Sequence, residues 1–167
     1  MDDDRVVDEA VIEEEARYLP TVERVYRSDA IEVLWEPSLC IHVGTCFRGL
    51  PEVFDPRARP WVNIEGASPE EIAAVVEQCP SGALHYRRRD GGPQEEAGSE
   101  VTVQPRTNGP LLLRGPIEVI DVQGNVVRTD TRLALCRCGA SENKPYCDGS
   151  HREIDFRTEP FLRAPGE

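Results

Sequence analysis

The chain has few aromatic residues, which limits the core that either half can build. Aromatic side chains make up 6% of its 167 residues, and hydrophobic residues as a whole make up 39%. A chain of this length has room for one medium-sized domain or two small ones. Small domains with thin cores are usually stabilised by a metal centre or by disulfides. The six cysteines are therefore the first residues to interpret.

Long hydrophobic runs are also missing. No stretch approaches the roughly 20 apolar residues that a membrane-spanning helix needs. The first residues, Met1 to Asp4, have neither the basic start nor the apolar run of a secretory signal. We therefore expect a cytoplasmic protein with no membrane partner. In that compartment paired cysteines more often bind metal than form disulfides.

Positive charge is scarce. The chain has 31 Asp and Glu against 19 Lys and Arg, a net charge of −12, and residues 1–30 alone hold 10 acidic and 4 basic groups. Phosphates repel an acidic surface, so we expect no nucleic-acid partner. The sequence has no nucleophile–base arrangement, phosphate loop or dinucleotide fingerprint, which favours a carrier over an enzyme.

The chain divides into four predicted segments. They are an acidic arm, a compact unit, a linker rich in Gly and Glu, and a β-rich unit, at residues 1–29, 30–88, 89–100 and 101–167. In the arm, Ile12, Ala16 and Leu19 fall on one face of a short helix, and a partly disordered tail fits the same residues.

The compact unit has clear signals for strands and one helix. Residues 31–35 and 84–88 read as strands, which places His85 on an exposed position of the second strand. Between them, Ser68 and Glu71 are typical of a capping box at a helix start. The apolar spacing that follows aims Cys79 at the core.

The β-rich unit shows only short strand signals. We expect strands at residues 101–104, 111–114, 117–121, 126–128 and 133–135, with a turn at residues 123–125. Together with the first unit, this predicts an α+β protein of two small domains.

The strongest chemical signal is a cysteine and histidine loop near the C-terminus. Cys136, Cys138, Cys147 and His151 place three thiolates and one imidazole within one short segment. Such a set can hold a soft metal centre, and by ligand type alone a structural zinc ion also fits.

This loop closely resembles the CDGSH family of iron–sulfur domains. The family pattern is Cys-x-Cys, a Ser or Thr three residues later, and then Pro-x-Cys-Asp-Gly-Ser-His, and every position is met. The resemblance implies a 2Fe–2S cluster rather than zinc, with Cys136 and Cys138 on one iron and Cys147 and His151 on the other. It also implies a β-rich fold with a cluster-binding loop and a short helix, and suggests a homodimer formed through this domain.

A second cysteine set lies in the compact unit. Cys40 and Cys46 flank a loop in which Gly44 permits a tight bend, and Cys79 is followed by Pro80, which ends the helix. These cysteines could instead be small buried hydrophobes. The inward aim of Cys79 and the Cys-Pro pair argue against that reading.

Residues 30–88 resemble a divergent single-cluster ferredoxin. The bacterial ferredoxin run places a third cysteine between the first two, and here Val43 takes that position. The resemblance implies a small ferredoxin-like domain with Cys40, Cys46 and Cys79 as ligands. Two clusters fit three thiolates: a 3Fe–4S cluster, or a 4Fe–4S cluster with a fourth ligand, for which His42 is the nearest candidate. The alternative for His42 is a surface histidine beside the cluster.

The two sites together predict electron transfer to or from a redox partner protein, either a reductase or an acceptor. A histidine ligand raises the reduction potential of the second cluster. The alternative function is iron–sulfur storage, delivery, or redox or pH sensing through the labile His-ligated 2Fe–2S cluster. A structural metal module without redox activity is a third hypothesis.

Overall fold

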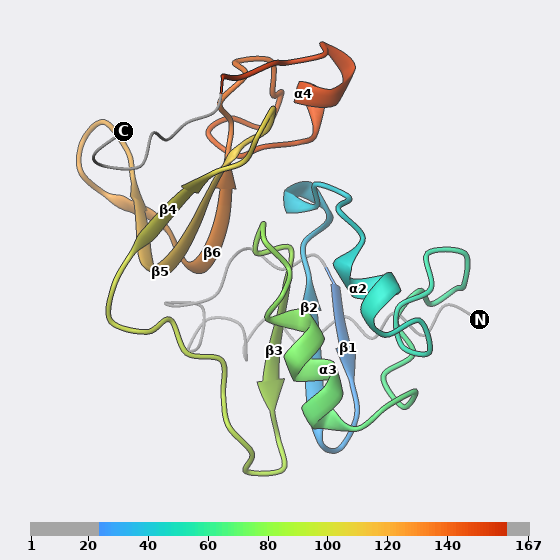
Figure 1. Ribbon diagram of the computed structural model, residues 1–167. Coiled ribbons are helices and arrows are strands. Elements are labelled where there is room, and N and C mark those ends of the chain that lie inside the picture. The colour runs from blue at the N-terminus through green and yellow to red at the C-terminus, as the bar shows by residue number, and fades with distance from the viewer. Residues whose placement is uncertain (1–23, 160–167) are drawn as a thin grey trace, which may run out of the picture.

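The computed structural model describes residues 24–159 as a mixed architecture of two small antiparallel sheets and a few short helices (Figure 1). The two units follow one another in the order that the sequence predicts. The predicted helix around Ile12, Ala16 and Leu19 lies outside the described residues. Within residues 24–159, no helix is long and apolar enough to cross a bilayer.

The first sheet has the strand order β1-β2-β3, with bounds Arg24–Arg27, Ile31–Trp35 and Leu84–Arg88. The second and third strands match their predicted bounds, whereas β1 lies in the segment predicted as an acidic arm. Helix α3, Pro69–Val76, contacts β3 and turns Ile72 and Val76 into the core. Its predicted capping box is present, with Ser68 and Glu71 each accepting a backbone N–H of the other.

A cysteine-bearing loop connects β2 to the rest of the first unit. It holds a single 3₁₀ turn, η1 at Pro37–Leu39, and a short helix, α2 at Thr45–Gly49. Gly44 caps α2 with a φ of 75°, a left-handed conformation that glycine adopts without strain. This bend brings the two ends of the loop together.

The second sheet has the order β4-β5-β6, with bounds Thr102–Pro105, Leu111–Ile120 and Val126–Leu135. The strand predicted at residues 101–104 corresponds to β4, and the four other short strands merge into the two long strands β5 and β6. β5 continues through Gly115 and Pro116, where the register with β6 shifts. The chain then passes through a loop to α4, Ser150–Glu153.

One hydrophobic core spans both units. Ile117 and Leu133 from the second sheet belong to the same buried cluster as Val33, Phe54 and Ile72 from the first unit. The two sheets therefore pack against each other.

Buried charges reinforce the contact between the two units. His85 was predicted to be exposed, and this prediction is wrong: it is 5% exposed. Its Nδ1 lies 2.9 Å from a carboxylate oxygen of Glu95, in the predicted linker, and its Nε2 forms an ion pair of 3.1 Å with Asp130 of β6. Burial favours the neutral imidazole, but the two carboxylates outweigh it and raise the pKa of His85 to about 9.

Candidate metal centres

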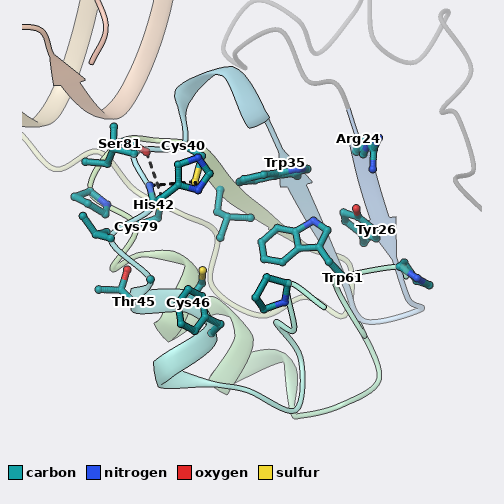
Figure 2. A pocket seen from close by; sticks show the side chains of 18 of the residues that line it. Arg24, Tyr26, Trp35, Cys40, His42, Thr45, Cys46, Trp61, Cys79 and Ser81 are labelled. Carbon is teal, nitrogen blue, oxygen red and sulfur yellow. Dashed lines mark hydrogen bonds between the residues drawn. The ribbon is translucent and has the colours of Figure 1, made fainter. Parts of the chain in front are cut away.

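The three cysteines of the first unit line one cavity of about 660 Å³. Cys40 follows η1, Cys46 lies in α2 and Cys79 follows α3, so three separate elements contribute one thiol each. Figure 2 shows the cysteines around one end of the cavity, with Trp35 and Trp61 at the other. The fold thus brings together the three predicted ligands of the first cluster.

Burial has the largest effect on the pKa values of Cys40 and Cys46 in this cavity. Burial, with smaller contributions from the nearby Cys79 and Cys46, raises the pKa of Cys40 to about 11. The backbone N–H of His42 donates to Cys40 Sγ at 3.4 Å, and the N–H of Phe47 lowers the pKa of Cys46 against the larger effect of burial. Amides aimed at thiolate sulfur are typical of iron–sulfur sites, where they tune the reduction potential.

His42 lies beside Cys40 rather than across the cavity from it. It is exposed, has a φ of 54°, and its Nδ1 is 3.6 Å from Cys40 Sγ. The distance between His42 Nδ1 and Cys40 Sγ suits a hydrogen bond. If His42 and Cys40 bound different irons of one cluster, these two atoms would lie farther apart. The ligand role of His42 therefore stays a prediction.

Val43 occupies the position of the absent ferredoxin cysteine and packs against the other unit. It joins Ile41 in a small apolar cluster with Leu112, Ala134 and Cys147. A hydrophobic side chain at this position therefore serves the contact between the two cysteine loops. The sequence gives no signal for this contact, because its partners lie about a hundred positions apart along the chain.

The C-terminal loop arranges its four predicted ligands as two close pairs. Cys136 Sγ lies 3.9 Å from Cys138 Sγ, and Cys147 Sγ lies 3.4 Å from His151 Nδ1. Two ligands of one tetrahedral metal with bonds of about 2.0–2.3 Å are about 3.3–3.8 Å apart. Each pair is thus spaced to share one metal atom.

The two pairs do not converge on a single point. Across residues 24–159, no three Cys, His, Asp or Glu side chains are close enough to hold one metal ion. The type of metal centre held by these two pairs stays a prediction.

Local hydrogen bonds hold the C-terminal loop in shape. Asp148 accepts from the backbone and hydroxyl of Ser150 and from the N–H of Glu142, and these bonds lower its pKa to about 2. The amides of Ala140 and Gly149 donate to Cys138 and Cys147, each at 3.4 Å. These contacts join residues of the loop to one another, so the site is built locally.

The loop also sets the protonation of its ligands. Burial opposes ionisation of Cys136, but the backbone N–H groups of Ser141 and Gly139 lower its pKa. Burial lowers the pKa of His151, and the charge of Arg152 lowers it further. A deprotonated thiol and a neutral imidazole are the forms that bind metal.

The two candidate centres are neighbours. Ile41, Val43 and Pro80 line the cysteine cavity and also a second cavity of about 390 Å³, which His151 and Arg152 line as well. Three residues therefore form a common wall between the two cavities, and His151 is the predicted ligand that lines the second one.

Comparison with known proteins agrees with this division. Residues 26–89 match a family model described as a divergent 4Fe-4S mono-cluster, and residues 108–152 match one described as an iron-binding zinc finger of CDGSH type. These families support the binding of iron–sulfur clusters by both units.

Curated relatives include the protein YjdI and several CDGSH iron-sulfur domain proteins. The uncharacterized protein YjdI of Escherichia coli K12 is 33% identical over 66 residues, which cover 40% of this chain and 87% of that protein. The CDGSH iron-sulfur domain-containing protein 2 homolog of Drosophila sechellia is 32% identical over 68 residues, covering 40% of this chain and 48% of that protein. The homolog of Drosophila ananassae is 36% identical over 63 residues, covering 36% and 44%. The chain therefore contains a divergent 4Fe-4S mono-cluster domain at residues 26–89 and an iron-binding domain of CDGSH type at residues 108–152.

Proposed function

We propose that the protein is a two-cluster electron carrier in which electrons pass between the clusters inside one chain. Cys40, Cys46 and Cys79 hold a 3Fe–4S or 4Fe–4S cluster in the first unit. A 2Fe–2S cluster is held in the second unit by Cys136, Cys138, Cys147 and His151. The observation that carries this proposal is the common wall between the two cavities.

The wall supports short-range electron transfer because tunnelling falls steeply with distance. Ile41 follows Cys40 directly in the chain, and it packs in one apolar cluster with Cys147, a ligand of the other cluster. The charge of Arg152 acts on both Cys40 and His151, lowering the pKa of each. One cation therefore lies within electrostatic reach of both sites.

Ligand chemistry sets the direction of transfer. Imidazole in place of thiolate raises the potential of a 2Fe–2S cluster, whereas ferredoxin-type clusters lie low. Electrons then enter at the three-cysteine site and move to the His-ligated site. The protein itself carries electrons in the cytoplasm and catalyses no reaction on a substrate.

The partners follow from charge and from exposed apolar side chains. The net charge of −12 favours a redox partner with a basic docking surface. The second sheet exposes apolar residues on β4 and around the β5–β6 hairpin, namely Val101, Val103, Ile120, Val122, Val126 and Val127. Exposed apolar groups of this kind support a homodimer formed through the CDGSH domain.

Internal transfer is tested with anaerobic rapid kinetics. The protein is mixed with a reductant that reacts at the first cluster, and reduction of the 2Fe–2S cluster is followed by absorbance and electron paramagnetic resonance. In the intact chain the second step should not depend on protein concentration. In an equimolar mixture of Cys79→Ala and Cys138→Ala, each lacking one cluster, it should become second order.

Two results would count against the proposal. One is a second step that depends on protein concentration in the intact chain. The other is transfer of the intact 2Fe–2S cluster to an apo-protein without any electron exchange between the sites, which would favour storage or delivery. Iron analysis of the same samples distinguishes the 3Fe–4S from the 4Fe–4S form.

A further inference from the structure

We infer that Arg132, a residue of the CDGSH domain, positions Cys79, a ligand of the other cluster. The first cluster site is then completed by the second domain. This inference rests on the proposed cluster at Cys40, Cys46 and Cys79.

The side chain of Arg132 is inserted into the first unit. It is 1% exposed and projects from β6 across the contact between the two sheets. Its Nη1 donates to the carbonyl oxygens of Val76 and Cys79, each at 2.7 Å, and its Nη2 donates to that of Leu84 at 2.8 Å. One guanidinium thus ties the end of α3, the ligand Cys79 and the start of β3 to one another.

The carbonyls that Arg132 binds lie at and beyond the end of a helix. Helix α3 ends at Val76, and the carbonyl of Val76 accepts from the N–H of Cys79 at 3.0 Å as well as from Arg132. Pro80 follows Cys79 and has no N–H to donate to a neighbouring carbonyl. A buried cation at a helix C-terminus satisfies the carbonyls and also interacts favourably with the helix dipole.

The backbone of β6 also lies close to the turn that follows Cys79. Gly82 has a φ of +73°, and a Cβ at this position would lie 2.2 Å from the carbonyl oxygen of Arg132. Only glycine permits this close approach. The turn after Cys79 therefore contacts both the side chain and the main chain of Arg132.

The charge of Arg132 is balanced within the site. Its Nη2 lies 2.6 Å from Glu95, which also accepts from the hydroxyl of Thr131 and contacts His85. Burial disfavours the ionised carboxyl, but hydrogen bonding to His85 and the charges of His85 and Arg132 lower the pKa of Glu95 to about 2. A buried cation that is paired in this way has a fixed orientation.

The neighbouring strand offers a matched control. Arg114 of β5 is the register partner of Arg132 and also donates to a carbonyl at the end of α3, that of Glu77, at 2.7 Å. Arg114 is exposed and has no bond to Cys79. The two arginines therefore differ in their contact with Cys79: Arg132 donates to its carbonyl, whereas Arg114 donates to that of Glu77.

The test compares Arg132→Lys with Arg114→Lys in the full-length, cluster-loaded protein. Lysine keeps the charge opposite Glu95, but its single nitrogen cannot reach three carbonyls in the geometry of the guanidinium fork. Iron loss to a chelator is followed separately for each cluster by electron paramagnetic resonance. We expect Arg132→Lys to lose the iron of the three-cysteine cluster at least tenfold faster than the unsubstituted protein, and Arg114→Lys to match that protein.

The identity of the affected cluster separates positioning from general destabilisation. Arg132 lies four residues before Cys136, so damage to its own domain would release the 2Fe–2S cluster first. Gly82→Ala, which disturbs the same contact from the other side, should also destabilise only the three-cysteine cluster. If either Arg132→Lys or Gly82→Ala folds poorly, the other variant still shows which cluster is lost first.

Three outcomes have different meanings. Preferential loss of the 2Fe–2S cluster in Arg132→Lys, or unchanged rates for both clusters, would overturn the role of Arg132. An unsubstituted protein that contains only about two iron atoms per chain would instead overturn the proposed three-cysteine cluster. Selective loss of the first cluster, with the second intact, would establish that one domain completes the site of the other.

Discussion

The two cysteine sites are built by different means. The four candidate ligands of the C-terminal site lie between Cys136 and His151, in a loop held by its own hydrogen bonds. Those of the N-terminal site extend from Cys40 to Cys79, lie in or next to three different elements and line one cavity. A local site needs little outside support, whereas a dispersed site depends on whatever fixes its elements, including the other domain.

Burial sharpens this contrast. Burial raises the pKa of Cys40 to about 11, whereas backbone N–H groups lower the pKa of Cys136 despite the opposing effect of burial. Without metal, the Cys40 thiol is therefore neutral, and it must lose its proton when a cluster binds. The second site holds at least one thiol that ionises more readily.

The largest expected effect comes from the core that joins the two units. Leu133 of β6 is fully buried in the common cluster, so Leu133→Ala should lower the free energy of unfolding by about 2–5 kcal/mol. The signals of both clusters should disappear in one transition during anaerobic urea unfolding. Val122→Ala, at a side chain that is 98% exposed, serves as the control and should change little. Separate transitions, with only the C-terminal one shifted, would mean that the units are independent.

A smaller effect is expected from the buried charges between the units. The pKa of His85 is about 9 in the folded protein and about 6.5 in the unfolded chain. Since the folded value is the higher one, this stabilisation is complete below about pH 6.5 and is lost as pH rises through about 9. Its full size is roughly 3 kcal/mol.

The comparison with His85→Gln isolates this contribution. The free energy of unfolding of the original protein should fall between pH 7 and pH 10 relative to that of the variant. Parallel pH profiles for the two proteins would show that His85 is not held protonated by Glu95 and Asp130.

The smallest effect concerns acid and the C-terminal site alone. His151 can bind iron only through a ring nitrogen without a proton, so protons compete with the metal. Burial and Arg152 lower its pKa, but in the released loop it returns to about 6.5, and cluster retention should weaken as pH falls below that value.

Replacing the imidazole ligand tests this directly. His151→Cys should retain the 2Fe–2S absorbance to lower pH and should lower its reduction potential, since thiolate replaces imidazole. The signal of the three-cysteine cluster provides an internal reference in the same sample. Superimposable bleaching curves for the two proteins would mean that His151 does not set the acid sensitivity.

Local sequence patterns predicted much of the fold. The strands at residues 31–35 and 84–88 and the capping box of Ser68 and Glu71 are where the sequence places them. The short strands of the second unit were predicted as fragments, because Gly115 and Pro116 interrupt the pattern in the middle of β5. The burial of His85 was not predicted, because the carboxylates that pair with it, Glu95 and Asp130, come from other segments of the chain.

The sequence by itself determined the two kinds of cysteine site, the order of the two units and the local frame of the CDGSH loop. Most of these features depend on residues a few positions apart, and Cys79 was assigned from its place at the end of a helix and next to Pro80. Tertiary structure decided that Val43 packs against the second domain, that Ile41 and Pro80 separate two neighbouring cavities, and that Arg132 binds the carbonyl of Cys79. Those contacts join residues that are roughly 50 to 100 positions apart, and chain folding alone brings them together, so no local pattern records them.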